Sequence, residues 1–456
     1  MRIIKTWDLT KDEIRAHLIR PFVDEVEVTP AAMERTQAVW GEALTPWDAV
    51  ARILADVKKL GDLAAIEYAL KLDGAQLTKE SLWVSEAEWD WAMGQVSPEF
   101  MQSLKIAHEN IYRYHSYGLP KSWITEESHG IILGQRITPI DKVGIYAPGG
   151  SAPLVSTVLM CAVPARVAGV GEIIMTSPVG PDGVMNPHIL VAARLAGVDK
   201  VLKLGGAQAI AALAYGTDSI SPVDKIVGPG NIYVTLAKKM VFGRVGIESL
   251  AGPSEILILA DESADSRHLA ADLLSQAEHD PEAGAILVTD SLSLAEAVLS
   301  ELAIQLEALG RESIARQSLA KYGLILVCQD LAEGAYWANV SAPEHLELCV
   351  DNPWELLPLI RHAGAIFLGH WASETVGDYV AGPNHVLPTN GTARFSSPLG
   401  VEDFVKRSSI ISYTKTGLEE FGPHAVELAT IEGLDAHANA VQVRLATLAA
   451  EVKRPD

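Results

Sequence analysis

A glutamine and a histidine in segment 275–279 have side chains that could share one metal ion. Gln276 and His279 are three residues apart, near the end of a helix that we expect to begin near Ser266. This spacing places both side chains on one face of the helix, and an imidazole nitrogen is a common zinc ligand. A histidine at a helix end also commonly lies on the surface or interacts with the helix dipole. The pair alone therefore leaves metal binding open.

Four further candidates lie in or beside predicted loops. Asp378 and His385 are seven residues apart in a connection rich in glycine and proline, and such loops often position ligands and catalysts on a rigid sheet. Taken singly, Asp378 suits an Asx-type turn and His385 an ordinary polar loop position. Glu432 and His437 present the same choice. Glu432 also suits the role of an ordinary acid in the first turn of a helix, and His437 also suits an exposed position on a helix.

The adjacent residues Glu344 and His345 offer a carboxylate and an imidazole side by side. They follow Pro343 at an expected helix start. Imidazole titrates near neutral pH, so His345 suits proton abstraction from an alcohol, and the neighbouring carboxylate could orient a water molecule. The alternative is that Pro343 begins the helix, Glu344 favours its dipole and His345 has no special role.

Three glycine-rich turns each follow a predicted strand and precede a predicted helix. Backbone amides in such turns can bind phosphates. The fingerprint Gly-x-Gly-x-x-Gly is absent, so spacing alone does not predict an ordinary dinucleotide site, and tight strand-to-helix turns remain the alternative. The turns are 148–151, 205–208 and 228–231.

The first third of the chain has the pattern of helices. Apolar residues between Val50 and Leu60 repeat at a period near 3.6, while Thr45 suits the N-cap, Pro46 the first turn and Gly61 the end. A second helix is predicted after 97–99.

After residue 140, short apolar runs alternate with helical stretches, as in βαβ units. We therefore expect an α/β fold with two Rossmann-like parallel-sheet domains and helical N-terminal and C-terminal extensions. A helical tail is expected from about 408 to 448, after a long ordered connection at 382–400. The expected strands are 143–146, 173–176, 201–204, 225–227, 256–260, 285–289, 324–328 and 365–368.

Composition excludes several classes of protein. A chain of 456 residues is long enough for two or more packed units. Its formal net charge of -22 makes nucleic acid and anionic membranes poor partners. No signal-peptide core or apolar run long enough for a membrane span is present. We expect Cys161, Cys328 and Cys349 to be reduced and the protein to be cytoplasmic.

Seven segments, in consistent order from about residue 45 to 445, resemble histidinol dehydrogenases. Together they are far more specific than any single motif. They are 144–151, 205–217, 227–231, 251–255, 276–279, 343–347 and 378–389.

The resemblance implies roles for individual residues. It implies one zinc ion per subunit, held by Gln276, His279, Asp378 and His437. It also implies that His345 takes the alcohol proton and that Glu344 activates water. Tyr146, Gln208 and Asn231 match positions that contact NAD. The implied substrate-binding residues are Ser254, Gln276, His279, Glu344, His345, Asp378, His385, Glu432 and His437.

The implied reaction is two successive NAD-dependent oxidations of L-histidinol, through an enzyme-held aldehyde, to L-histidine. The resemblance also implies a homodimer whose C-terminal segments cross to the partner. Whether Glu432 and His437 act within their own subunit or across the dimer stays open.

We expect four segments with distinct roles. Residues 1–40 form a helical extension, and 41–144 with 255–399 form a Rossmann-like domain that carries the metal and acid/base residues. Residues 145–254 form a second such domain on the cofactor side. Residues 400–456 form a helical dimerisation segment.

Other functions are possible on the same residues. Segments 114–118 and 248–250 depart from the family pattern, so a zinc and NAD dehydrogenase of the same fold acting on another small alcohol, such as a sulfonated diol, is the main alternative. Glu432 favours a cationic amino alcohol and would repel a sulfonate. A module that only binds zinc or nucleotide has no need of Glu344 and His345, and both are present.

Two further points limit the prediction. A phosphate-transferring enzyme is disfavoured because the chain lacks the Gly-x-x-x-x-Gly-Lys-Ser/Thr motif. Nitrogen and oxygen ligands also accept manganese or cobalt, so the sequence does not identify the metal.

Overall fold

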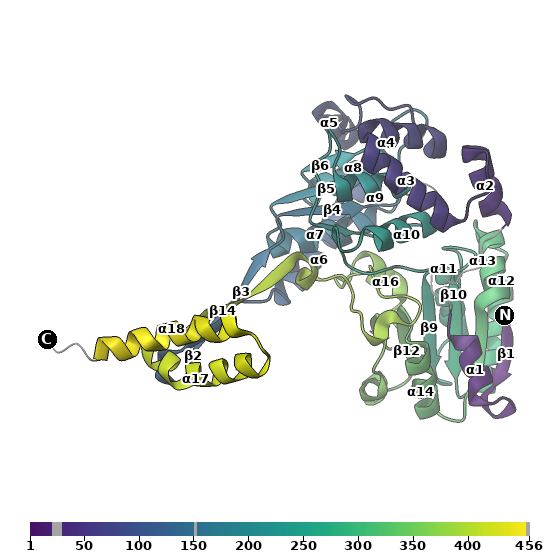
Figure 1. Ribbon diagram of the computed structural model, residues 1–456. Coiled ribbons are helices and arrows are strands. Elements are labelled where there is room, and N and C mark those ends of the chain that lie inside the picture. The colour runs from purple at the N-terminus through teal and green to yellow at the C-terminus, as the bar shows by residue number, and fades with distance from the viewer. Residues whose placement is uncertain (21–29, 150–152, 453–456) are drawn as a thin grey trace. The chain divides into compact units, whose positions relative to one another are not determined.

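The computed structural model describes residues 1–20, 30–149 and 153–452 (Figure 1). The chain forms two compact units. The first contains Met1–Leu119 and Ile140–Phe404, and the second contains Pro120–Pro139 and Val405–Asp456. Within the described residues, no helix combines the length and apolar character that crossing a membrane requires.

A six-stranded sheet in the first unit has the order β1-β11-β10-β9-β12-β13, and all its neighbours are parallel. In that order its strands are Arg2–Lys5, Gly323–Val327, Gly284–Thr289, Glu255–Ala260, His345–Cys349 and Ala365–Leu368.

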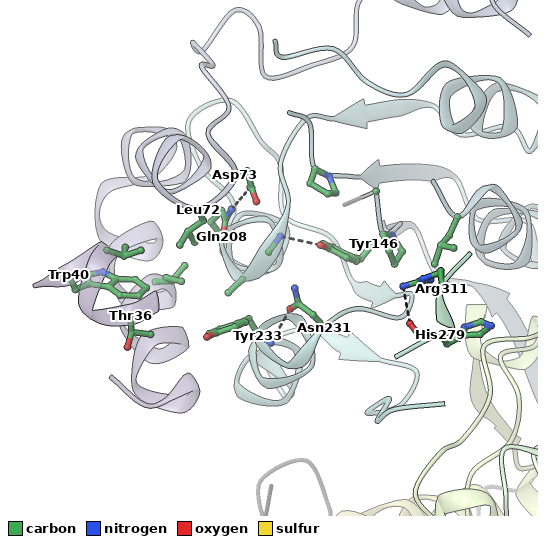
Figure 2. Close-up of a pocket in the computed structure, with 18 residues that line it drawn as sticks. Thr36, Trp40, Leu72, Asp73, Tyr146, Gln208, Asn231, Tyr233, His279 and Arg311 are labelled. Atoms are coloured by element: carbon green, nitrogen blue, oxygen red, sulfur yellow. Dashed lines mark hydrogen bonds between the residues drawn. The ribbon is translucent and has the colours of Figure 1, made fainter. Parts of the chain in front are cut away.

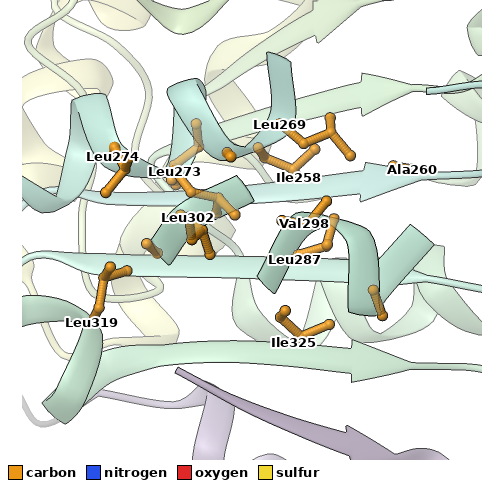
Figure 3. Packing of buried hydrophobic residues seen from close by; sticks show 14 of the residues in the cluster. Ile258, Ala260, Leu269, Leu273, Leu274, Leu287, Val298, Leu302, Leu319 and Ile325 are labelled. Atoms are coloured by element: carbon orange, nitrogen blue, oxygen red, sulfur yellow. The ribbon is translucent and has the colours of Figure 1, made fainter. Parts of the chain in front are cut away.

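Helices cover both faces of this sheet, which explains the continuous apolar runs in its strands. Along β9, Ile256 and Ile258 join one buried cluster, whereas Leu257 and Leu259 join the cluster on the opposite face. Figure 3 shows Ile258 and Leu287 packed beneath helices of the first cluster. That face carries α11 (Ser266–Ala277), α12 (Leu292–Leu306) and α13 (Glu312–Tyr322), and the other carries α1 (Lys11–Leu18) and α14 (Leu331–Ser341).

A five-stranded parallel sheet has the order β6-β5-β4-β7-β8. Its presence beside the six-stranded sheet confirms the predicted α/β fold with two parallel sheets. In sheet order the strands are Lys200–Leu202, Glu172–Thr176, Lys142–Tyr146, Lys225–Val227 and Gly246–Ile247. Its helices are α7 (Val155–Ala168), α8 (Pro187–Leu195), α9 (Gly206–Tyr215) and α10 (Ile232–Val241).

The helices of the first third pack against this second sheet's helices. α3 (Pro46–Leu60) contacts α9 and α10, and α6 (Pro98–Tyr117) contacts α7. This differs from the expected boundaries, which assigned 41–144 to the domain of the other sheet, because the apolar stripe of α3 identifies a buried face but not its partner. Other helices are α2 (Pro30–Trp40), α4 (Asp62–Tyr68), α5 (Glu86–Met93), α15 (Pro353–Leu356) and α16 (Glu374–Tyr379).

Local capping signals predicted several helix ends correctly. The Thr45 side chain accepts a hydrogen bond from the Asp48 amide, and Gly61 ends α3. α6 begins after the Ser97 N-cap, and α11 begins at Ser266 as expected. These signals succeed because they depend on neighbouring backbone groups and not on distant packing.

The expected helix start at Glu344 is wrong. His345 begins β12, which pairs with β9 on one side and β13 on the other. All five residues of this strand are buried. A short apolar run can suit a buried strand or a helix, and the pairing with two parallel strands decides for the strand.

Strands also interrupt both predicted terminal extensions. β1 lies in the N-terminal segment, and β14 (Val405–Ser412) occupies the start of the tail that we expected to be helical from about 408. In the second unit, β14 pairs with β3 (Ile132–Pro139), which pairs with β2 (Trp123–Glu126), all antiparallel. The tail's helices are α17 (Lys415–Ile431) and α18 (Asp435–Val452), which pack on each other.

A buried ion pair fixes the turn between β7 and α10. Lys238 Nζ lies 2.6 Å from Glu248 Oε1, and the side chains are 2% and 5% exposed. Lys238 also donates to the Gly228 carbonyl, and the Gly228 amide donates to Glu248. Gly228 has φ +114, and a Cβ there would lie 2.1 Å from the Tyr146 carbonyl oxygen. Glu248, in a segment that departs from the family pattern, thus stabilises this turn.

We expect Lys238→Met to lower stability by about 3–5 kcal/mol, because it leaves the Glu248 carboxylate buried without its cation. Thermal unfolding should show a lower Tm, whereas Lys105→Met, at an exposed position of α6, should change stability by less than about 0.5 kcal/mol. Adding Glu248→Gln to Lys238→Met should recover part of the loss. Equal Tm values for the two lysine variants would contradict this account.

Candidate active site

The amino ends of two central strands in the six-stranded sheet position the candidate base. His345 and Glu344 are 3% and 5% exposed, and His345 is the first residue of β12. Glu344 Oε2 accepts a hydrogen bond from the Glu255 amide at 3.0 Å, at the start of β9. His345 Nδ1 lies 3.3 Å from the Glu255 carbonyl oxygen. Adjacent strands therefore hold both side chains in fixed positions.

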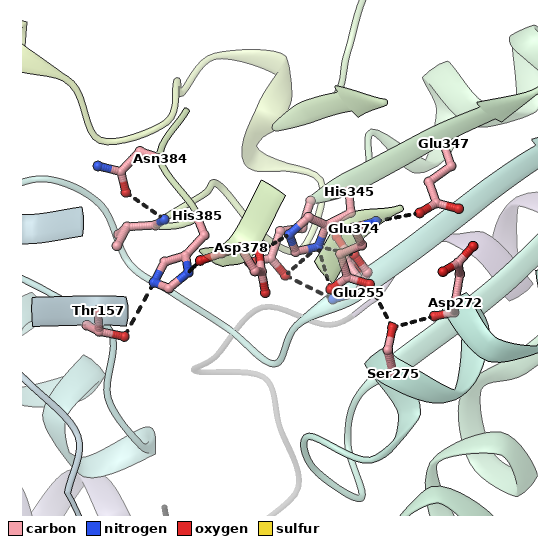
Figure 4. A network of polar contacts seen from close by, with 12 residues as sticks. Thr157, Glu255, Asp272, Ser275, His345, Glu347, Glu374, Asp378, Asn384 and His385 are labelled. Carbon is pink, nitrogen blue, oxygen red and sulfur yellow. Dashed lines mark hydrogen bonds and ion pairs between the residues drawn. The ribbon is translucent and has the colours of Figure 1, made fainter. Parts of the chain in front are cut away.

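The short helix α16 adds two carboxylates around the same imidazole (Figure 4). Glu374 Oε1 lies 3.6 Å from His345 Nδ1, and Asp378 Oδ1 lies 3.5 Å from His345 Nε2. These residues are four positions apart, so one helix face presents both. Glu374 is buried, and its amide donates to Glu347 at 2.8 Å. The ring is thus enclosed by acids from α16 and by Glu344, which directly precedes β12.

One group of side chains here could hold a metal ion. His279, Glu374 and Asp378 each offer a ligand atom, and these atoms lie within 4.8 Å of one another. Gln276 is 0% exposed, and neither of its amide atoms has a hydrogen-bond partner among the described residues. A buried unpaired amide is unfavourable, and a cation would give its oxygen a partner. The residues present therefore fit a divalent metal ion.

The carboxylates dominate the protonation of this cluster. Burial opposes charge on His345, but Glu374, Glu344 and Asp378 outweigh it and raise the pKa of His345 to about 10. Burial raises the pKa of Glu344 to about 8 and that of Glu374 to about 7. Burial also acts against the charge of Asp378, yet the hydrogen bond from His345 and nearby histidines lower its pKa. Such opposed shifts are typical of functional sites.

Two further predicted residues border the cluster. His385 Nδ1 lies 3.0 Å from the Asp378 carbonyl oxygen, and its Nε2 lies 3.4 Å from Thr157 Oγ1 on α7. Burial lowers the pKa of His385. Ser254 directly precedes Glu255, whose carbonyl faces His345. The first unit therefore brings together most of the predicted residues, namely Ser254, Gln276, His279, Glu344, His345, Asp378 and His385.

The remaining two, Glu432 and His437, belong to the second unit. His437 lies in the first turn of α18 and is exposed. Glu432 is the C-cap of α17, so the interpretation of this residue as an acid in the first turn of a helix is wrong. The glycine that follows, Gly433, has φ +72 and separates the two helices; a glycine at this position is a typical helix-end signal.

A cavity of about 460 Å³ adjoins the carboxyl edge of the five-stranded sheet (Figure 2). The three residues that the resemblance assigns to NAD all line this cavity: Tyr146 at the end of β4, Gln208 in the first turn of α9 and Asn231 at the N-cap of α10. His279 also lines this cavity, so the cavity reaches the group of side chains that could hold a metal ion. Gly150 and Ser151, in one of the glycine-rich turns, lie outside the described residues.

Hydrogen bonds hold all three of these polar groups, and Gln208 Nε2 donates to Asp73 Oδ2 at 3.2 Å. Tyr146 Oη accepts from the Gly206 amide at 3.2 Å, and the Asn231 side chain accepts from the amides of Tyr233 and Val234. The glycine turns before α9 and α10 thus also act as tight strand-to-helix turns, which was the alternative to phosphate binding. Both helix N-termini remain directed at one cavity, which suits an anionic group.

Comparison with known sequences assigns this site to a family. The family model described as "Histidinol dehydrogenase" matches residues 42–445. The chain belongs to the histidinol dehydrogenase family. The histidinol dehydrogenase of Syntrophotalea carbinolica is 53% identical over 87% of this chain and 92% of its own length. That of Halalkalibacterium halodurans is 54% identical, over 87% and 93%.

A solved histidinol dehydrogenase has the same fold. The crystal structure of the Elizabethkingia anophelis protein matches with a TM-score of 0.90 and 37% identity, covering 98% of each chain. The resemblance of the seven motifs to this family, and the predicted fold, are therefore confirmed.

Sequence reasoning missed Glu374 and Asp73, although the structure places Glu374 in the candidate metal group and Asp73 in the cavity wall. The spacing of Glu374 and Asp378 on one helical face was the available signal. It was overlooked because α16 has only 6 residues and lies in a segment rich in turns.

In the metal-free protein, the pKa values of two buried histidines should be shifted in opposite directions from the ordinary value. We expect His345 to stay protonated at pH 8, whereas burial lowers the pKa of His115 to about 4, so His115 should be neutral at pH 6. Since the pKa of His345 lies above its ordinary 6.5, its stabilising effect is complete below pH 6.5 and is lost as pH rises through about 10. The effect of His115 is present above 6.5 and is lost as pH falls through about 4.

NMR of the ring nitrogens, assigned with His345→Asn and His115→Asn variants, measures both titrations. Glu374→Gln should lower the pKa of His345 and leave that of His115 unchanged. Two rings that titrate together near pH 6.5 would contradict the effect of the surrounding carboxylates.

Proposed function

We propose that this chain catalyses the NAD-dependent, four-electron oxidation of L-histidinol, through L-histidinaldehyde, to L-histidine. Family membership supports the reaction, and the observation that carries it is the position of Glu344 and His345. Both are buried, fixed by β9 and adjacent to a group of metal-binding side chains. This arrangement provides a base, a water-activating carboxylate and a cation site within one cluster.

The proposed metal is one zinc ion per subunit, held by Gln276, His279, Asp378 and His437. The unpaired amide of Gln276 and the proximity of His279 to Asp378 support this set. Bound zinc would supply positive charge that orients the donor groups of the substrate and disfavours a proton on His345. Glu374 faces the same space, where its carboxylate can interact with His279 or with the ring of His345.

His345 is the proposed base in the first oxidation. Its Nδ1 lies 3.3 Å from the Glu255 carbonyl, which favours a proton on that nitrogen. Its Nε2 lies 3.5 Å from Asp378 Oδ1; with Asp378 held by a metal ion, this nitrogen would be available to accept the alcohol proton. NAD, when bound, supplies the hydride acceptor in both oxidations. The alcohol would thus lose its proton to His345, and loss of the hydride that bound NAD would accept would leave the aldehyde.

Glu344 is proposed to activate water in the second oxidation. Water adds to the aldehyde carbon while Glu344 takes one of its protons, which leaves the anion of the hydrate. Bound NAD would accept the hydride of this anion, and the resulting carboxylic acid releases its remaining proton to solvent and becomes the carboxylate. The Glu255 amide keeps Glu344 Oε2 in place. Burial raises the pKa of Glu344 to about 8, so it is a stronger base than an exposed carboxylate. A bound zinc ion would favour its ionised form.

Substrate recognition is assigned to the ligand residues and to Ser254, His385 and Glu432. A carboxylate from Glu432 would attract the cationic amino alcohol and repel a sulfonated diol. Tyr146, Gln208 and Asn231 are proposed to contact NAD, since all three line the cavity that reaches His279. The three buried, free cysteines support a reducing compartment, and a cytoplasmic location stays a prediction.

Purified zinc-loaded protein should reduce NAD when given L-histidinol, and should form two NADH per L-histidine. A chelator should abolish the reaction and zinc should restore it, because the substrate loses its anchoring cation. Absorbance of the reduced nicotinamide and chromatography of the product measure the ratio. No NADH from histidinol in protein shown to hold zinc would overturn the proposal, and a sulfonated diol would then be the next substrate to test.

We further propose a homodimer in which the C-terminal segment of each subunit completes the partner's site. In the second unit, Leu428, Ile431 and Val443 are exposed apolar side chains, with exposures of 64%, 74% and 49%. Such residues on neighbouring helices suit a protein interface. The same helices carry Glu432 and His437. Burying these helices against a partner subunit would therefore bring the side chains of Glu432 and His437 to the partner's site.

Mixed dimers can test this exchange. His345→Gln and His437→Gln homodimers should each lose more than 100-fold in kcat, because one lacks the base and the other a metal ligand. A heterodimer of the two, purified with two different tags, should recover about half of wild-type activity, since one of its two sites has both residues intact. If His437 acts within its own subunit, every site stays defective and the heterodimer remains inactive.

A further inference from the structure

The cavity at the five-stranded sheet has two ends of different chemistry (Figure 2). His279 and Arg311 lie at one end, and His279 also belongs to the group of metal-binding side chains. Trp40, Leu72 and Asp73 lie at the other end, beside Gln208. The two ends come from different parts of the first unit, and only one adjoins the reacting groups.

This asymmetry orients the cofactor, provided that the proposed NAD-dependent reaction is correct. Hydride transfer requires the nicotinamide ring to lie beside the substrate, and hence at the His279 end. The adenosine half must then occupy the end lined by Trp40, Leu72 and Asp73. The apolar surface of Trp40 and Leu72 suits an adenine ring, and Asp73 is the carboxylate in the same wall.

The side chain of Asp73 is held over the glycine turn that begins α9. Its Oδ2 accepts a hydrogen bond from Gln208 Nε2 at 3.2 Å, and a Cβ added to Gly205 would lie 3.3 Å from the same oxygen. Asp73 ends a helical segment at Ala69–Asp73, after which Gly74 turns the chain with φ +70. The carboxylate thus has a fixed position beside the path of a dinucleotide.

Among the described residues, no cation forms an ion pair with the Asp73 carboxylate. Burial raises the pKa of Asp73 to about 6, with the Gln208 hydrogen bond acting in the opposite direction. At neutral pH the side chain is therefore predominantly a carboxylate, which accepts hydrogen bonds and repels anions.

We propose that Asp73, positioned by Gln208, binds the ribose hydroxyls of the adenosine half and excludes a 2′-phosphate, so that it selects NAD over NADP. A 2′-hydroxyl can donate a hydrogen bond to the carboxylate. A 2′-phosphate at the same position would place two anionic groups in contact within a partly desolvated cavity. Acidic side chains serve this purpose in ordinary dinucleotide folds, and here the carboxylate comes from a helix end outside the sheet.

Asp73→Asn tests the proposal because it keeps a side chain that can bond Gln208 and removes the charge. With L-histidinol saturating, kcat/KM for NAD should fall about 10-fold, through KM, with kcat and the KM for histidinol unchanged. The kcat/KM for NADP should rise, so that the ratio of kcat/KM for NAD to kcat/KM for NADP falls by at least about 10-fold. Asp218→Asn, which removes one charge from an exposed residue outside the cavity wall, should leave the ratio unchanged.

Direct binding of NADH and NADPH, followed by quenching of tryptophan fluorescence, separates this inference from the proposed reaction. A lower NADH/NADPH binding ratio in Asp73→Asn supports the role of Asp73 even if histidinol proves inert. The inference is overturned if the NAD/NADP ratio of kcat/KM and the NADH/NADPH binding ratio both stay within about 2-fold of wild type. An equal loss of affinity for both cofactors would also overturn it. Asp73→Ser, checked for an unchanged Tm, repeats the test if the asparagine variant does not fold.

Discussion

The burial of several carboxylates around one imidazole is the constraint on which the rest of the site depends. Glu344, Glu374 and Glu347 are nearly inaccessible to solvent, and Asp378 lies beside them. Buried like charges repel, and they lose hydration that the protein interior does not replace. Protonating His345 compensates for one of them, and a metal cation would compensate for more. The cluster therefore favours a bound cation for electrostatic reasons that do not depend on any family resemblance.

The arrangement of the two sheets explains how this cluster can serve a redox cofactor. Ligands of open α/β sheets ordinarily lie at the carboxyl ends of the strands, and the cavity at β4, β6 and β7 follows that rule. The acid/base residues instead lie at the amino ends of β9 and β12. His279 lies in the lining of the cavity and in the candidate metal group. In the proposed function, one sheet would thus provide the turns that bind the nucleotide, and the other would provide rigidly held proton-transfer groups.

Local sequence signals predicted the elements better than the assembly. The apolar runs of β9 and β10 and the caps of α3 were identified because they depend on nearby residues. β12 was misassigned because its neighbours in the sheet, β9 and β13, are not adjacent to it in the sequence. A run of five residues that mixes apolar and polar side chains does not reveal which strands it pairs with. β14 was missed for the same reason. The site residues came from motif resemblance. Glu374 has only its helical spacing from Asp378 as a signal, and Asp73, which lies in none of the motifs, required coordinates to be found.

The structure also changes what the departures from the family pattern imply. Glu248 lies in a segment that weakened the case for histidinol as substrate. Its carboxylate, however, bonds Lys238 and the Gly228 amide, and both partners are internal. A substitution that stabilises a turn need not alter substrate choice, so this segment no longer favours another alcohol. The discriminating group is instead Glu432, because a carboxylate brought to the site would attract an amino alcohol and repel a sulfonate. Substrate specificity and subunit exchange are therefore linked: if the second unit supplies Glu432 to a partner, the dimer determines which alcohol is oxidised.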